Sequence, residues 1–148
     1  MATTTDKTTK VLNELLAICD DGAKGFAKAA EDADAADLKR IFSEYAAQRA
    51  SYATQLKREI VSLGEQPEES GHAIAAFHRG WMSLKETVGN KDKAIIDECE
   101  AGEDRAVKAY RDALEQALPP SALLTVRTQL SGVLEAHNQV RSLKQGEN

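Results

Sequence analysis

The chain has 148 residues, 29% of them charged, a net charge of −5 and two cysteines. That length suffices for one domain with a hydrophobic core, and the negative charge provides no basic face for nucleic acid. The N-terminal MATTTDKTTK lacks the apolar core of a signal peptide, and no apolar run approaches the roughly 18 residues that a membrane span requires. We therefore expect one cytoplasmic domain covering residues 1–148, with no nucleic-acid binding and no membrane span.

Two long helices are predicted before residue 64. The first begins near Asp6 or Thr8, which leaves residues 1–7 disordered, and it ends near Ala30. Asp34, in the acidic turn EDADAAD, is the expected N-cap of the second helix, which ends at Gly64. In both, apolar residues recur every three or four positions, as on one face of a helix. These stripes are Leu12, Leu15, Leu16, Cys19, Ala23, Phe26 and Ala30, then Leu38, Ile41, Phe42, Tyr45, Tyr52, Leu56, Ile60 and Leu63.

Residues 64–90 form a long connection with its own short helix. After the polar EQPEESG, the stretch HAIAAFHRGWMSLKETVG places apolar residues on one stripe, and Gly89-Asn90 closes it. The stripe consists of Ile74, Phe77, Trp81, Leu84 and Val88.

Two further long helices follow, separated by Pro119-Pro120. The short turns within each pair of long helices predict two antiparallel hairpins, and residues 64–90 can run the length of the bundle between them. We therefore predict an all-α four-helix bundle with one long crossover connection that carries a short helix. The expected stripes are Ile95, Ile96, Cys99, Ala106, Val107, Tyr110 and Leu114, then Leu123, Val126, Leu130, Leu134, His137, Val140 and Leu143.

The two halves resemble each other faintly. LLAICDDGAKGFAKAA (15–30) aligns with IIDECEAGEDRAVKAY (95–110) and matches Cys19 with Cys99 and Gly22 with Gly102. An internal repeat, a shared packing pattern of two hairpins, and chance are all compatible with this match.

Five stretches together resemble one bacterial family. They are DDGAKGF, LGEQPEESG, FHRGWMSLK, AGEDRAVKAYRDAL and AHNQV. The sequence is similar to a domain of unknown function, a four-helix bundle within the ferritin-like superfamily, from about residue 8 to residue 144. The resemblance implies a ferritin-like bundle with the crossover derived above, and it implies no established activity.

Ferritin-like di-iron proteins hold their metals with a Glu on each of two helices and a Glu-x-x-His on each of the other two. The only Glu-x-x-His pair here, Glu69 and His72, lies in the connection. In VLEAHNQV, Glu135 and His137 are two residues apart, so Glu135 points away from the apolar face that carries His137. These residues are therefore not a chelating pair.

Glu103 and His137 are the remaining candidate metal ligands. Glu103 lies between Cys99 and Ala106 near the middle of its helix, and His137 is expected within about one turn of it on the facing helix. One interpretation is half of an iron or manganese site, assisted by Asp20 or Asp21 and by Tyr52. The other, which we prefer, is a hydrogen bond in which Glu103 accepts from His137 or from a tyrosine hydroxyl.

The two cysteines are expected on apolar helix faces, where cysteine acts as a small hydrophobic residue. A disulfide would require the Cα atoms of Cys19 and Cys99 to lie within about 7 Å of each other.

A complete fold with an incomplete metal site favours a non-enzymatic binding, scaffold or stress-associated protein without a cofactor. Its partner would be another protein or a second copy, as in a dimer. The first alternative is a metal-binding oxidase or iron-handling protein with an atypical ligand set around Glu103 and His137. The second is a carrier of an apolar ligand in a cavity lined by small residues.

Overall fold

The computed structural model describes residues 3–68 and 90–146, and the regular structure within these ranges consists of four long helices. They are α1 (Thr4–Asp32), α2 (Ala36–Ser62), α4 (Lys91–Leu114) and α5 (Pro120–Gly146). The short helix expected in the stretch 72–89 lies outside the described residues. No helix in the described ranges is long and apolar enough to cross a bilayer.

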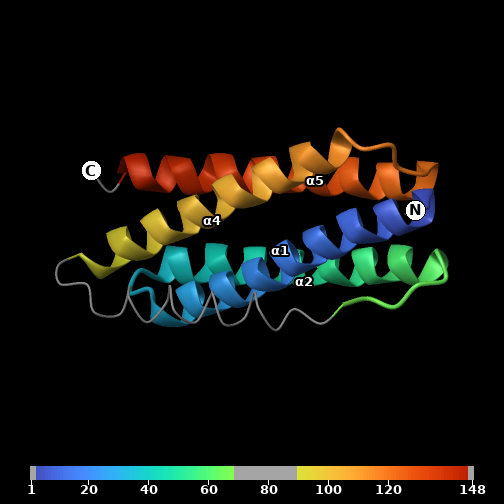
Figure 1. Cartoon of the computed structure of the whole chain (residues 1–148). Coiled ribbons are helices and arrows are strands. Elements are labelled where there is room, and N and C mark those ends of the chain that lie inside the picture. The colour runs from blue at the N-terminus through green and yellow to red at the C-terminus, as the bar shows by residue number, and fades with distance from the viewer. Residues whose placement is uncertain (1–2, 69–89, 147–148) are drawn as a thin grey trace.

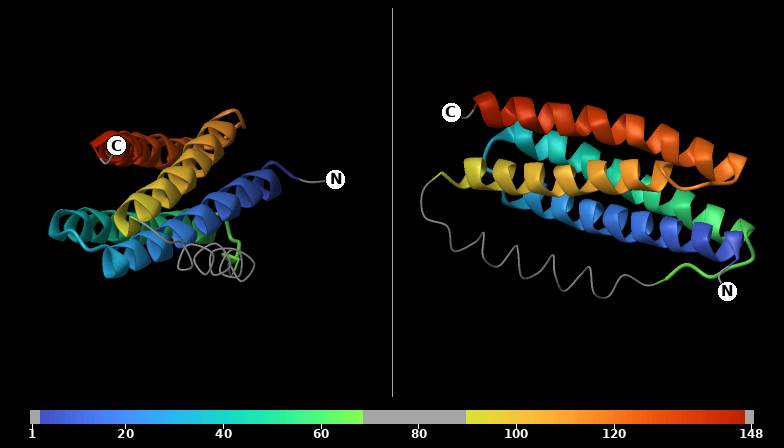
Figure 2. Two further views of the ribbon diagram at one scale, coloured as in Figure 1. Left: turned by 90° about the vertical axis from the view of Figure 1, so that its left-hand side faces the viewer. Right: turned by 45° about the horizontal axis from the view of Figure 1, so that its top comes forward.

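The helices form two antiparallel hairpins, α1–α2 and α4–α5 (Figure 1). α1 packs against α2 and α4, and α5 packs against α4 and α2, so that α2 and α4 are diagonally opposite. α2 ends and α4 begins at opposite ends of the bundle, as Figure 1 and the right-hand view of Figure 2 show. The connection between them therefore spans the length of the bundle, and the predicted four-helix bundle with one long crossover is confirmed.

The apolar core comprises two clusters, one toward each end of the bundle. The first contains the start of α1, the end of α2, the end of α4 and the start of α5. The second contains the opposite end of each helix and includes the stacked rings of Phe26 and Phe42, 5.9 Å apart. Between the clusters lies the polar centre of the molecule, described below.

Two predicted helix starts are wrong. α1 begins at Thr4, because the Thr3 side chain accepts from the Asp6 amide while the Asp6 carboxylate accepts from the Thr3 amide. This capping box satisfies amides that a helix start leaves unpaired, so residues 4–7 are helical rather than disordered. Asp34 does not cap α2. Instead the Asp92 carboxylate of α4 accepts from the amides of Asp34 and Ala35, at 2.8 and 3.1 Å.

Most of the buried stripe of α5 is shifted by one position along the helix from the predicted stripe. Ala136 is fully buried, whereas its neighbour His137 is only partly buried. Leu130 and Leu134 on one side of the true stripe and Leu143 on the other pack against the core from its edges, so the apolar arc is too wide to fix its centre from the sequence. The buried residues of α5 are Ala122, Val126, Gln129, Val133, Ala136 and Val140.

The two hairpins share their pattern of burial. At an offset of 80 residues, buried positions of α2 coincide with buried positions of α5, in line with the faint match between the two halves of the sequence. Arg49 of α2 and Gln129 of α5, both large polar residues in the core, occupy equivalent places in this alignment. The coinciding pairs are 42 and 122, 49 and 129, 53 and 133, 56 and 136, and 60 and 140.

Candidate functional site

A buried ion pair joins the diagonal helices α2 and α4. Arg49 donates from Nη1 and Nη2 to the two carboxylate oxygens of Glu103, at 2.7 and 2.6 Å. The side chains are 1% and 2% exposed. Arg49 lies in the core because it is seven residues from both Phe42 and Leu56, which places the three on one face of α2. The parallel, two-point geometry is the strongest form of a charge-assisted hydrogen bond.

Two further contacts hold the Arg49 guanidinium in place. Its Nε donates to Gln48 Oε1 at 3.2 Å, and its carbon Cζ lies 5.4 Å from the centre of the Phe26 ring, in cation–π range. Burial alone would lower the pKa of Arg49, but the hydrogen bonds and negative charge of Glu103 outweigh burial and raise it. The centre of the bundle is therefore a fixed, hydrogen-bonded pair of charges.

Gly22 of α1 provides the space for this arginine. A Cβ at position 22 would lie 3.2 Å from Cγ and 3.4 Å from Nη1 of Arg49. The helical glycine thus allows the close approach of a side chain from α2.

A hydrogen-bond network links all four helices beside the ion pair. Tyr110 donates to Gln129 at 2.6 Å, so the Cys19 thiol, 3.1 Å from the phenol oxygen, is the donor in its contact with Tyr110. Gln129 donates onward to Gln55, at 2.9 Å, and to the backbone oxygen of Tyr52, at 3.2 Å. Burial raises the pKa of Cys19 to about 11 and also raises the pKa of Tyr110. Both groups are therefore protonated at neutral pH, and the thiol is a poor nucleophile.

Polar side chains also hold α2 and α5 together. Glu59 accepts from Ser121 and Thr125, at 2.8 and 3.0 Å, near one end of this seam. At the middle, the Tyr52 phenol lies over Gly132, where a Cβ would overlap its hydroxyl and lie 3.1 Å from Cζ. Toward the other end, Tyr45 donates to Gln139.

The structure places Glu103 in the core but does not bring it together with His137. His137 Nε2 instead contacts the Asp104 carboxylate at 2.6 Å, and Asp104 is 63% exposed. Glu135 is exposed, as expected for the outer side of α5. The Glu69–His72 pair lies outside the described residues.

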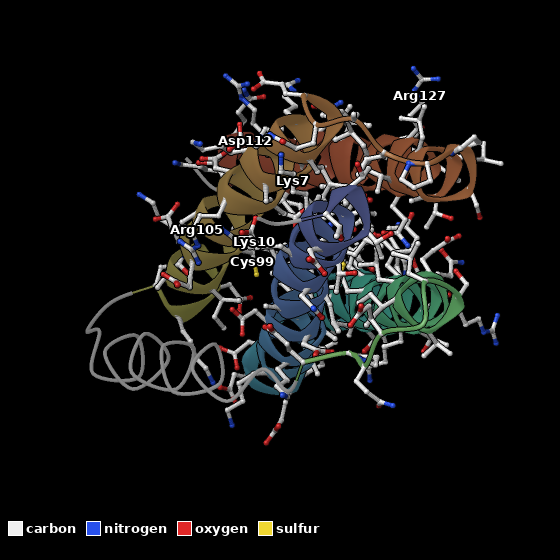
Figure 3. The ribbon with its side chains drawn as sticks, turned by 45° about the vertical axis from the view of Figure 1, so that its right-hand side comes forward. Lys7, Lys10, Cys99, Arg105, Asp112 and Arg127 are labelled. Atoms are coloured by element: carbon white, nitrogen blue, oxygen red, sulfur yellow. The ribbon has the colours of Figure 1, made fainter. Side chains whose placement is uncertain are left out.

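The cysteines are free and buried, which matches their expected place on apolar helix faces. Cys19 belongs to one core cluster and Cys99 to the other. Figure 3 shows Cys99 on the side of α4 that faces α1, while Arg127 extends outward from α5.

The residues of the core do not fit a di-metal site of the ferritin-like kind. Such a site requires carboxylates from all four helices and two histidines. Here both oxygens of Glu103 bind a guanidinium, and His137 contacts the exposed Asp104. Among residues 3–68 and 90–146, no group of three or more His, Cys, Asp or Glu side chains is arranged to hold a metal ion.

Sequence reasoning missed Arg49 and Gln129. Their seven-residue spacing from buried neighbours was a usable signal, since Arg49 continues the stripe of Phe42 and Leu56, and Gln129 follows Ala122 and precedes Ala136. A charged residue on an apolar stripe is unexpected unless it has a partner inside, and Glu103 was available as that partner.

Comparison with known proteins fixes the family. Residues 7–116 match the domain of unknown function DUF2383. The chain belongs to this family. Among curated proteins no match was found.

Two solved structures share the fold. One is a two-domain protein from Anabaena variabilis with DJ-1/ThiJ/PfpI-like and ferritin-like domains, at a TM-score of 0.78 and 16% identity over 99% of this chain. The chain spans only 38% of that protein's length. The other is an archaeal Dps homologue from Halobacterium salinarum, at a TM-score of 0.62 and 16% identity, with 95% of this chain and 81% of that chain covered. The DUF2383 chain is therefore a ferritin-like four-helix bundle.

Proposed function

We propose that this DUF2383 protein is a non-enzymatic ferritin-like bundle that acts through its outer surface, as a binding or scaffold protein. The observation that carries the proposal is the ion pair between Arg49 and Glu103. A permanent organic cation is bonded to the buried carboxylate that a metal ion would need as its ligand.

A metal ion at Glu103 would have to displace this arginine. The guanidinium would then remain buried beside a second positive charge, and loss of one partner of a buried ion pair costs about 3–5 kcal/mol. His137, the other main ligand of the predicted site, contacts Asp104. Metal binding in the core would thus work against the folded state.

The Cys19 thiol and the Tyr110 phenol of the hydrogen-bond network support the same conclusion. Cys19 and Tyr110 are buried, protonated and bonded to each other, so neither is poised to attack a substrate. The charged and polar residues able to contact another molecule are on the outside of the helices.

Metal content tests the proposal directly. Purified protein is incubated with Fe²⁺ or Mn²⁺ without oxygen, separated from free metal by gel filtration and analysed for metal, and ferroxidase turnover is measured in parallel. We expect neither stoichiometric metal nor turnover. A content near two metal ions per chain, as in di-iron bundles, would overturn the proposal.

Alanine variants identify the alternative if metal does bind. Loss of bound metal in both Glu103→Ala and His137→Ala, with helix content retained, would establish the metal-binding reading built on these two residues. Asp112→Ala, on the exposed side of α4, is the matched control and should leave metal content unchanged.

A further inference from the structure

The outer face of α2 differs in composition from that of α4. All seven exposed residues of α4 are charged. On α2, none of the five exposed residues between Glu44 and Lys57 is charged, and the only charge in that interval is the buried Arg49. The five are Ala47, Ala50, Ser51, Thr54 and Gln55.

Exposed charges of opposite sign flank this uncharged centre. Glu44 is seven residues before Ser51, and Arg58 is seven residues after it, so the three follow one line along the helix. Each charged residue is thus about 10 Å from Ser51 along the axis. Ala47 and Thr54 alternate with them on the same outward face, and Val61, 59% exposed, continues that row.

This pattern is complementary to itself. If a second α2 packs antiparallel with the two Ser51 residues opposite each other, Glu44 of each copy faces Arg58 of the other. Two identical ion pairs then enclose a centre of small uncharged side chains, which allow two helices to approach closely. Depletion of charge at the centre and polar residues at the rim are typical of protein interfaces, and a twofold axis brings the same patch of both copies together.

We propose that the occupant of this face is a second copy of the chain, docked through α2 against α2 in antiparallel orientation about Ser51. The charges favour a second copy because one surface supplies both the anion and the cation. Among the residues that the structure describes, Glu44 pairs only with Arg40, at 3.4 Å, with both side chains more than 60% exposed. Such a pair contributes about 0.3–0.5 kcal/mol, so Glu44 is readily shared with another partner.

The second copy would be the partner in the surface-binding function proposed above, so this interface rests on that proposed function. The two fail separately, because metal content reports on the core and association state reports on α2. Two metal ions per chain in a dimer would overturn only the proposed function, and a metal-free monomer would overturn only this inference.

Charge exchange tests the interface in the full-length protein. Sedimentation equilibrium over about 1–100 µM should show a dimer for the wild type, which corresponds to a Kd in or below that range. Glu44→Arg and Arg58→Glu each place two like-charge pairs in the interface, so each should weaken association by about tenfold or more. The double variant Glu44→Arg/Arg58→Glu should recover the dimer.

Mixing the two single variants provides the sharpest result. Each junction of the mixed pair joins one cation with one anion, so the heterodimer should form although neither variant dimerises well alone. Arg111→Glu on the charged face of α4 is the control and should leave association unchanged. A monomeric wild type at all concentrations, or a dimer unaffected by either single exchange, would overturn the proposal.

Discussion

Replacing Arg49 with methionine should destabilise the protein severely. The substitution retains much of the apolar stem but leaves the carboxylate of Glu103, which is 2% exposed, without the two hydrogen bonds at 2.7 and 2.6 Å. Removing one partner of such a pair costs about 3–5 kcal/mol, a large part of the stability of a typical domain. We expect Glu103→Leu to cost a similar amount, because it leaves the guanidinium buried and unpaired.

The double variant Arg49→Met/Glu103→Leu distinguishes a buried ion pair from ordinary packing. It removes both charges together, so its free energy of unfolding should lie within about 1–2 kcal/mol of the wild type. Urea unfolding followed by circular dichroism at 222 nm measures all three variants. Arg40→Met, which removes an exposed pair, is the control and should change stability by less than about 0.5 kcal/mol. Additive losses in the double variant would refute this account of the core.

Three further substitutions or conditions test the surrounding structure. Asp92→Ala removes the acceptor for two amides at the start of α2 and should lower the free energy of unfolding by about 1–2 kcal/mol, measurable by thermal melting; an unchanged melt would mean that water replaces this cap. Gly132→Ala should destabilise the chain by about 1–3 kcal/mol because its Cβ overlaps the Tyr52 phenol, and the loss should disappear in a Tyr52→Leu background, as urea midpoints would reveal. Since burial raises the pKa of Cys19 from 9.0 to about 11, the unfolded thiol ionises first. The contribution of Cys19 to stability should therefore be complete below pH 9 and fall by about 2–3 kcal/mol by pH 11, so the total loss of stability should be smaller in Cys19→Ala. Equal urea midpoints at pH 8 and 10.5 would contradict this.

The fold could be predicted from the sequence because its signals are local. Apolar residues at helical spacing, Gly64 and Pro119-Pro120 mark four long helices, and the length of the connection selects the crossover arrangement. The starts of the helices were harder to predict from the sequence. Asp92 caps a turn more than 50 residues away in the chain, and no local pattern identifies such a partner.

The centre of the molecule was only half predictable. The apolar neighbours of Glu103 put it near the buried stripe, but finding its partner required knowing that α2 and α4 face each other diagonally across the core. A histidine on a wide apolar arc was the wrong choice, since Ala136 takes the buried position beside His137. Arg49 is seven residues from both Phe42 and Leu56, a spacing that indicates burial, but its charge argued against a place in the core.

The ion pair also has a consequence for how the hairpins recognise one another. The α1–α2 hairpin carries the cation and the α4–α5 hairpin carries the anion. Two copies of the first hairpin would enclose two arginines with no counter-ion, and two copies of the second would enclose two glutamates, so like hairpins repel when they try to assemble. Although the two hairpins share their burial pattern, the ion pair therefore disfavours pairing of α1–α2 with the α1–α2 hairpin of a neighbouring chain. It favours pairing of α1–α2 with α4–α5.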